Sequence, residues 1–200
     1  MRRTKYSIYA LKPGFQNLLR PLARILARAG VQANQMTILA CAVSVLTGVL
    51  ITARIQSPEV LLILPVVLLL RMAMNALDGM LAIEFGQKSA LGAYLNELGD
   101  VISDAFLYLP FAFLPYFDPL WIGAVIVCAV ISEMAGMIGG GRRYDGPMGK
   151  SDRAVAFGVM ALWIGFGGNV LKWVAWLFPR LLLVLLAITI VNRVRHGLRR

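Results

Sequence analysis

Six long apolar stretches dominate this chain, and they restrict its possible folds more than any other feature. They cover residues 36–53, 60–82, 90–114, 120–138, 154–170 and 181–194. A transmembrane helix needs about 20 mostly apolar residues, so the last two stretches are near the short limit. We therefore expect an all-α integral membrane protein with six transmembrane helices.

The composition agrees with a membrane protein, because 59% of the residues are hydrophobic and only 15% are charged. The formal net charge of +10 would suit a nucleic-acid-binding protein. A soluble protein of that kind would not carry several long apolar stretches, so we expect no nucleic-acid partner. Cys41 and Cys128 lie within apolar stretches and indicate small core residues rather than a disulfide or a zinc site.

The segment before the first stretch has the pattern of an amphipathic helix over residues 14–29. Its apolar residues recur at helical spacing, while Arg20, Arg24 and Arg28 fall on another face. This pattern predicts a juxtamembrane helix lying at the membrane interface, although a basic solvated tail is an alternative. We expect one domain over residues 1–200, made of this helix and a six-helix bundle over residues 36–194.

The basic residues predict the orientation of the bundle. An even number of crossings places sixteen of the twenty Lys and Arg residues on one side of the membrane. Arg54, Lys172 and Arg180 fall on the other side, and Arg71 lies within a stretch. Cytoplasmic loops are enriched in Lys and Arg, so both termini of this multi-pass protein are predicted to be cytoplasmic.

Two neighbouring stretches carry polar side chains that are rare in membrane segments. The short loop over residues 85–89 predicts that they form an antiparallel hairpin. At 1.5 Å per residue, Asp78 lies about 12 Å from that loop and Asp100 about 15 Å, so both carboxylates reach similar depth. Helical spacing places one set of residues on one face of the first helix: Arg71, Asn75, Asp78 and Ala82. A second set shares a face of the next helix: Gly92, Asn96, Asp100 and Asp104.

These faces predict a site for magnesium, manganese or calcium, because the donors are carboxylate and amide oxygens. Small residues at Gly79, Ala82 and Gly92 would let a ligand or a neighbouring helix approach the backbone. The alternative is that the polar groups only join the helices, by pairing with Arg71 or with each other. Five oxygen-bearing side chains favour a site, since each intramembrane charge costs about 2.5–3.5 kcal/mol on insertion scales.

The same residues resemble the signature of the CDP-alcohol phosphotransferase family, D-x2-D-G-x2-A-R-x8-G-x3-D-x3-D. The matching run is Asn75-x2-Asp78-Gly79-x2-Ala82-x9-Gly92-x3-Asn96-x3-Asp100. Ala33-Asn34-x2-Thr37 is similar to the family's P-N-x2-T. The chain also resembles a bacterial subgroup of inner-membrane proteins that share N-A-L-D-G and N-E-x-G-D.

The resemblance implies a homodimeric enzyme of phospholipid biosynthesis in the bacterial inner membrane. It would transfer a phosphatidyl group from a CDP-linked lipid, such as CDP-diacylglycerol, to an acceptor hydroxyl and release CMP. It implies Mg²⁺ or Mn²⁺ at Asn75, Asp78, Asn96 and Asp100, with Asp100 as the general base. The implied CDP contacts are Asp78, Gly79, Ala82, Gly92, Asn34 and Thr37.

The chain departs from the signature at three positions, with asparagine at 75 and 96 and Ile83 in place of arginine. An asparagine oxygen can ligate a hard cation but brings no charge, so the four positions carry −2 rather than −4. Asp104 could restore some negative charge. The alternative function is a catalytically impaired relative that binds lipid or a partner. A small transporter is a third class, but no inverted repeat of broken helices is evident.

A basic, glycine-rich segment over residues 139–153 lies on the predicted cytoplasmic side. Its cations could bind a phosphate of the acceptor or of CDP: Lys150, Arg153, Arg142 and Arg143. A loop that only touches anionic headgroups is equally consistent. Glu133 lies within the fourth stretch and could contact the acceptor or pair with Arg71. The sequence does not identify the acceptor.

Overall fold

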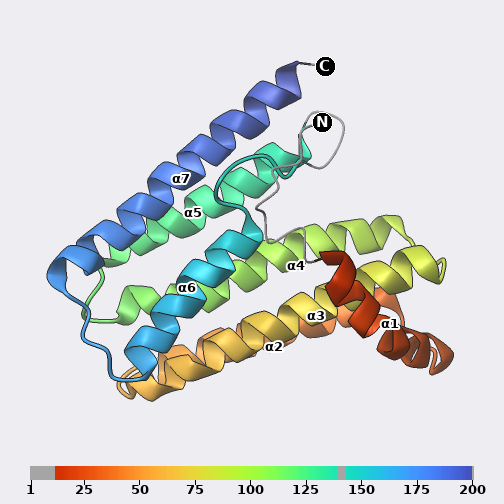
Figure 1. Cartoon of the computed structure of the whole chain (residues 1–200), viewed down its shortest axis with the longest axis horizontal. Coiled ribbons are helices and arrows are strands. Elements are labelled where there is room, and N and C mark those ends of the chain that lie inside the picture. Colours follow the sequence, from red (N-terminus) through yellow and green to blue (C-terminus); the bar gives the residue numbers. More distant parts are fainter. Residues whose placement is uncertain (1–11, 139–142, 200) are drawn as a thin grey trace. The chain divides into compact units, whose positions relative to one another are not determined.

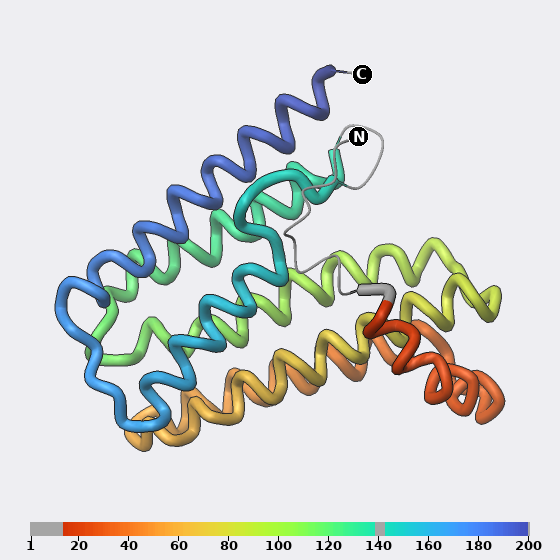
Figure 2. Tube along the Cα trace, in the orientation of Figure 1, coloured from red at the N-terminus to blue at the C-terminus, as the bar shows by residue number. Residues whose placement is uncertain are grey.

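The computed structural model describes residues 12–138 and 143–199, and it is helical throughout, with no strand in those ranges. Figures 1 and 2 show the course of the chain. Its α-helices are α1 (Lys12–Arg28), α2 (Ala33–Ala53), α3 (Ile63–Glu84), α4 (Ala90–Tyr108), α5 (Pro119–Met137), α6 (Lys150–Gly165) and α7 (Lys172–Leu198). Two 3-10 helices precede α3 and follow α4: η2 (Pro58–Leu62) and η3 (Leu109–Phe113). The predicted all-α class is confirmed.

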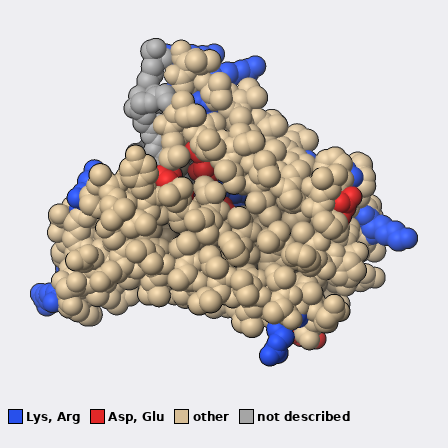
Figure 3. Space-filling view, turned by 180° about the vertical axis from the view of Figure 1, so that it is seen from behind, with Lys and Arg blue, Asp and Glu red and all other residues tan. Residues whose placement is uncertain are grey.

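Four helical segments in the described ranges are long and apolar enough to cross a membrane: Ala33–Ala53, Pro58–Glu84, Pro119–Met137 and Lys172–Leu198. Helix α6 has only 16 residues, and α4 includes Glu97, Asp100 and Asp104. The face seen in Figure 3 is mostly uncharged, as expected for helices in contact with lipid. Six α-helices follow α1 in the part of the chain that the structure describes, but the count of six membrane spans stays a prediction.

The last helix is longer than its apolar stretch predicts. It begins at Lys172, nine residues before position 181, and contains Pro179. A proline usually ends a helix because it lacks an N–H group and its ring clashes with the preceding turn. Here the helix continues through Pro179, and just beyond it Arg180 Nη1 donates a hydrogen bond to the Trp176 carbonyl at 2.7 Å. The Arg180 guanidinium also lies over the rings of Trp121 and Trp176.

The described residues form two compact units, and α2, α3 and α4 each contribute to both. The first unit contains the chain up to Val43 together with Leu69–Asp100. Its core joins α1 to parts of α2 and α3 through eight buried residues: Ala23, Ala33, Met36, Ala40, Met74, Leu77, Met80 and Leu81. Helix α1 leaves Leu18 and Ile25 exposed. Exposed apolar residues suit a helix at a membrane surface, and that location stays a prediction.

The second unit contains Ser44–Leu68 and residues from Val101 onward. Within it α5 and α7 run side by side (Figures 1 and 2). Aromatic rings fill part of its core, and the rings of Tyr108 and Phe157 stack with their centroids 4.1 Å apart. Gly165 allows α6 to meet η2 closely, because a Cβ at this position would lie 2.7 Å from Leu62 Cδ2.

Candidate functional site

The hairpin of α3 and α4 positions the signature residues within the first unit. Its loop turns at Gly86, whose φ of 70° is favourable for glycine. Helix α4 then begins beside Ser89, whose Oγ accepts a hydrogen bond from the Gly92 N–H at 2.9 Å. A serine at this position satisfies one of the free N–H groups of a first helical turn. Gly86 and Ser89 therefore define the turn after α3 and the start of α4.

Asp100 forms the centre of one polar group in this unit. Its Oδ1 accepts hydrogen bonds from Asn75 Nδ2 at 3.1 Å and from Arg71 Nη2 at 3.3 Å. Arg71 Nη2 also donates to the backbone carbonyl of Asp100 at 2.9 Å. The side chains of Arg71 and Asp100 are 5% and 11% exposed. The hairpin thus brings residues that are 25 and 29 positions apart into direct contact.

Asp78 contacts a residue that precedes it in the chain, in the first turns of α2. Thr37 Oγ1 lies 2.8 Å from Asp78 Oδ2, and both residues are buried. Because the carboxylate can only accept when ionised, the threonine hydroxyl is the donor in this bond. Thr37, which the family pattern links to CDP binding, therefore orients one of the two signature carboxylates.

The three predicted small residues have different surroundings. A Cβ added to Gly92 would lie 2.6 Å from Asn34 Oδ1, so this glycine allows α4 to approach the start of α2. A Cβ on Gly79 would have no atom of the described residues within 4 Å. Ala82 packs against the core of the first unit. Asn96 is half-buried on α4. Of the three small residues, Gly79 is therefore the one whose backbone a ligand could approach most easily.

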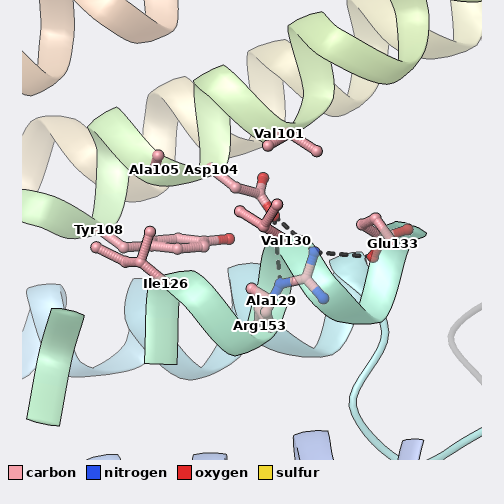
Figure 4. Close-up of a pocket in the computed structure, with 9 residues that line it drawn as sticks. All are labelled: Val101, Asp104, Ala105, Tyr108, Ile126, Ala129, Val130, Glu133 and Arg153. Carbon is pink, nitrogen blue, oxygen red and sulfur yellow. Dashed lines mark hydrogen bonds and ion pairs between the residues drawn. The ribbon is translucent and has the colours of Figure 1, made fainter. Parts of the chain in front are cut away.

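The second unit contains a separate buried ion-pair network. Arg153 Nη2 lies 2.8 Å from Asp104 Oδ2 and 3.0 Å from Glu133 Oε1. Figure 4 shows Asp104 of α4 and Glu133 of α5 reaching the Arg153 guanidinium. Arg193 of α7 lies 3.5 Å from Glu133 Oε2 and donates to the Ser132 carbonyl. Two cations and two carboxylates are thus in direct contact within this unit.

A small cavity of about 10 Å³ adjoins this network and has Tyr108, Asp104, Glu133 and Arg153 in its wall. That volume is enough for about one water molecule. Arg153 Nη1 is buried and has no hydrogen-bond partner in the described part of the chain. The guanidinium is therefore satisfied on its Asp104 side and unsatisfied at one nitrogen.

The basic loop before α6 packs against α7 in the part that the structure describes. The Met148 N–H donates to Thr189 Oγ1 at 2.9 Å, and a Cβ on Gly146 would lie 2.6 Å from Thr189 Cα. Arg143 and Lys150 are half-buried, whereas Arg153 is 1% exposed. Arg142 lies outside the described residues. Arg153 thus differs from Arg143 and Lys150 because it is fully buried within the ion-pair network.

Comparison with known proteins identifies the family. A family model described as CDP-alcohol phosphatidyltransferase matches residues 31–185. The chain belongs to this family. It is 45% identical over 198 residues to the inner membrane protein YnbA of Escherichia coli (strain K12), with 96% of each chain covered.

The CDP-alcohol phosphatidyltransferase fold is also found in solved structures. The chain is similar to the Mycobacterium tuberculosis phosphatidylinositol phosphate synthase PgsA1 with CDP-DAG bound, with a TM-score of 0.72 and 23% identity over 90% of this chain and 92% of that one. A structure of the same synthase with manganese and citrate also gives a TM-score of 0.72 and 23% identity, covering 90% of this chain and 88% of that one. At this identity the likeness shows the fold alone.

The residues at the signature positions fit a divalent cation in part. No group of three or more His, Cys, Asp or Glu residues that could hold a metal occurs within the described ranges. A cation would depend on Asp78 and Asp100, supplemented by the amide oxygens of Asn75 and Asn96. An oxygen-only set of this kind suits Mg²⁺ or Mn²⁺. Substrate phosphate oxygens would have to complete the coordination.

Two contacts were not predicted from the sequence. Glu133, for which the sequence left open an acceptor contact or a pairing with Arg71, pairs with Arg153 and Arg193, while Arg71 contacts Asp100. No sequence argument singles out Arg193, yet it is 2% exposed. Its place inside an apolar stretch was the available signal, because an arginine there usually faces a partner.

Proposed function

We propose that this protein transfers a phosphatidyl group from a CDP-linked lipid, such as CDP-diacylglycerol, to an acceptor hydroxyl in the bacterial inner membrane. The acceptor oxygen forms a bond to the β-phosphoryl group, the bond to the CMP oxygen breaks, and CMP leaves. The observation that supports this most is the position of Asp100. It occupies the last signature position, is 9% exposed, and is oriented by Arg71 and Asn75.

In this proposal Asp100 accepts the proton of the attacking hydroxyl. A general base must lie within hydrogen-bond reach of the proton that it removes. The contacts from Arg71 and Asn75 restrict rotation of the carboxylate. This lowers the entropic cost of orienting the base toward the attacking hydroxyl. Asp78, oriented by Thr37, faces the donor with the amide oxygens of Asn75 and Asn96.

A bound Mg²⁺ or Mn²⁺ would offset negative charge on the diphosphate and polarise the phosphoryl group. We propose Asn75, Asp78, Asn96 and Asp100 as its ligands. For the CDP moiety we propose contacts from Asp78, Gly79, Ala82, Gly92, Asn34 and Thr37. Gly79 is the clearest of these, because its open position would let a phosphate approach the backbone.

For the acceptor we propose the basic loop and the start of α6, with Arg142, Arg143, Lys150 and Arg153 as phosphate contacts. Asp104 and Glu133 would support the site through Arg153. We also propose a homodimer with six spans, an interfacial α1 and cytoplasmic termini. The basic residues of the loops support the cytoplasmic termini, and the homodimer is what the resemblance to the family implies.

The test is CMP release by purified protein supplied with CDP-diacylglycerol, manganese and a panel of hydroxyl acceptors. Asp100→Asn should abolish release, while Glu97→Gln on the same helix should retain it. Activity that survives in Asp100→Asn would remove this residue from the base role. Mass spectrometry of the lipid product would identify the acceptor.

A second candidate function is a non-catalytic relative that binds lipid or a partner protein. The neutral side chains of Asn75 and Asn96 favour it, since they remove charge from two ligand positions. Nucleotide binding without CMP release from any acceptor would support this candidate over the enzyme.

A further inference from the structure

Gln87 joins the loop between α3 and α4 to the segment that connects α1 with α2. Its Oε1 accepts a hydrogen bond from the Ala33 N–H at 2.7 Å, and its Nε2 donates to the Val31 carbonyl at 3.2 Å. These partners lie 54 and 56 positions earlier in the chain. Both are backbone groups with fixed donor and acceptor roles, so they determine the orientation of the Gln87 amide.

The partners of Gln87 lie at the ends of helices. Ala33 is the first residue of α2, and the first N–H groups of a helix have no partner within it. Val31 follows α1, and its N–H donates to the Leu26 carbonyl at 3.0 Å. The N–H of Gln87 donates to the Leu81 carbonyl in α3 at 3.4 Å. Gln87 therefore connects the end of α1, the start of α2 and the end of α3, all within the first unit.

The part of α2 that Gln87 contacts also carries two of the proposed CDP contacts. Asn34 is the second residue of α2, and Thr37 follows less than one turn later. Asn34 Oδ1 lies beside the first turn of α4, where a Cβ on Gly92 would be 2.6 Å from it. Thr37 Oγ1 lies 2.8 Å from Asp78 Oδ2. The position of both side chains relative to the α3–α4 hairpin therefore depends on where α2 begins, which the hydrogen bonds of Gln87 determine.

We propose that Gln87 is a positioning residue for the CDP moiety of the donor, because it fixes the start of α2 and so orients Asn34 and Thr37. The proposal rests on the proposed function, since it assumes that these two residues contact CDP. Groups that are ordered before a ligand arrives need not be ordered when it binds, and this raises affinity. Loss of the Gln87 hydrogen bonds should therefore raise the KM for the donor and leave kcat nearly unchanged.

The experiment measures binding of CDP, with Mn²⁺ present, to the purified full chain by titration calorimetry. Gln87→Met removes two hydrogen bonds at similar side-chain length and should raise the Kd for CDP about tenfold. Gln35→Met is the matched control, because Gln35 is exposed on the same turn of α2 and its Oε1 accepts from the nearby Gln32 N–H at 2.9 Å. It should change the Kd less than about twofold. An unchanged Kd in Gln87→Met, or an equal increase in Gln35→Met, would overturn the proposal.

A double variant separates positioning from a general loss of stability. If Gln87 acts through Asn34, the Kd increase of Gln87→Met with Asn34→Ala should fall short of the product of the two single increases. Single effects that multiply fully would overturn the proposal. Gln87→Asn keeps an amide but is one methylene shorter, so it should also weaken CDP binding. This variant keeps the test decisive if Gln87→Met does not fold.

The binding measurement is independent of turnover. Weaker CDP binding in Gln87→Met, with no CMP release by wild type, would uphold the inference while the enzyme function fails. CMP release by wild type with an unchanged Kd in Gln87→Met would do the reverse. Wild type that does not bind CDP would overturn both.

Discussion

Replacing Arg153 with methionine should strongly destabilise the protein. Arg153 Nη2 contacts Asp104 and Glu133 at 2.8 and 3.0 Å, and its side chain is 1% exposed. Methionine keeps an unbranched chain but removes the cation, so two carboxylates stay in a buried site with less compensation. Breaking a buried ion pair by removing one partner typically costs about 3–5 kcal/mol. Arg193 still contacts Glu133, which places the expected loss near the lower end of that range.

The assay is thermal and denaturant unfolding of purified protein in detergent micelles, followed by circular dichroism. Arg20→Met is the matched control, because Arg20 also makes two hydrogen bonds to one carboxylate, that of Glu84, at 3.0 and 3.2 Å. That pair is 38% and 36% exposed, so its loss should cost no more than about 1 kcal/mol. Adding Asp104→Asn to Arg153→Met should recover part of the stability, because it removes a buried carboxylate that has lost its contact with Arg153. Equal effects of Arg153→Met and Arg20→Met would refute the reasoning.

Three further predictions concern the first unit. Gly92→Ala should lower the free energy of unfolding by less than about 1 kcal/mol, because the atom nearest its Cβ, Asn34 Oδ1 at 2.6 Å, is the end of a side chain that can rotate away. Gly99→Ala, whose nearest contact is at 3.7 Å, is the control for the unfolding measurement. A much larger loss in Gly92→Ala would contradict this expectation. Thr37→Val should lower the free energy of unfolding by about 1.5–3 kcal/mol, because it removes the hydrogen bond to ionised Asp78. Thr37→Ser keeps the hydroxyl and should lose much less stability. Equal losses in the two variants would contradict this role of the hydrogen bond. Gly79→Ala should unfold like wild type, since its Cβ position is open, yet bind CDP-diacylglycerol more weakly; unchanged binding would remove this backbone from the donor site.

The contacts around Asp100 could be anticipated because they depend on local geometry. A short loop and a rise of 1.5 Å per residue determine which residues of an antiparallel hairpin lie at equal depth. That arithmetic applies to Asp78 and Asp100, and Asn75, which lies on the same predicted face as Asp78, is the residue that the structure joins to Asp100 at 3.1 Å. It does not identify Arg71 as their partner, because rotation of each helix about its axis depends on packing with the rest of the unit.

The partners of Glu133 could not be anticipated, since they lie 20 residues away on α6 and 60 residues away on α7. Pairing across three helices depends on their packing, and no spacing rule relates them. The start of α7 was missed for a related reason. Pro179 is a strong local signal for a helix boundary, but the helix continues through it in the folded chain.

The burial of Arg153 changes what its charge can do for an acceptor. From sequence it is one of four cations near a loop, and each looks able to bind phosphate. In the structure Asp104 and Glu133 already neutralise Arg153, and Glu133 also meets Arg193. A phosphate that reached Arg153 would have to displace a carboxylate or bind Nη1. Nη1 is the nitrogen of this guanidinium that has no hydrogen-bond partner in the described ranges. Arg143, which makes no ion pair with a described carboxylate, is therefore the stronger candidate for a phosphate contact.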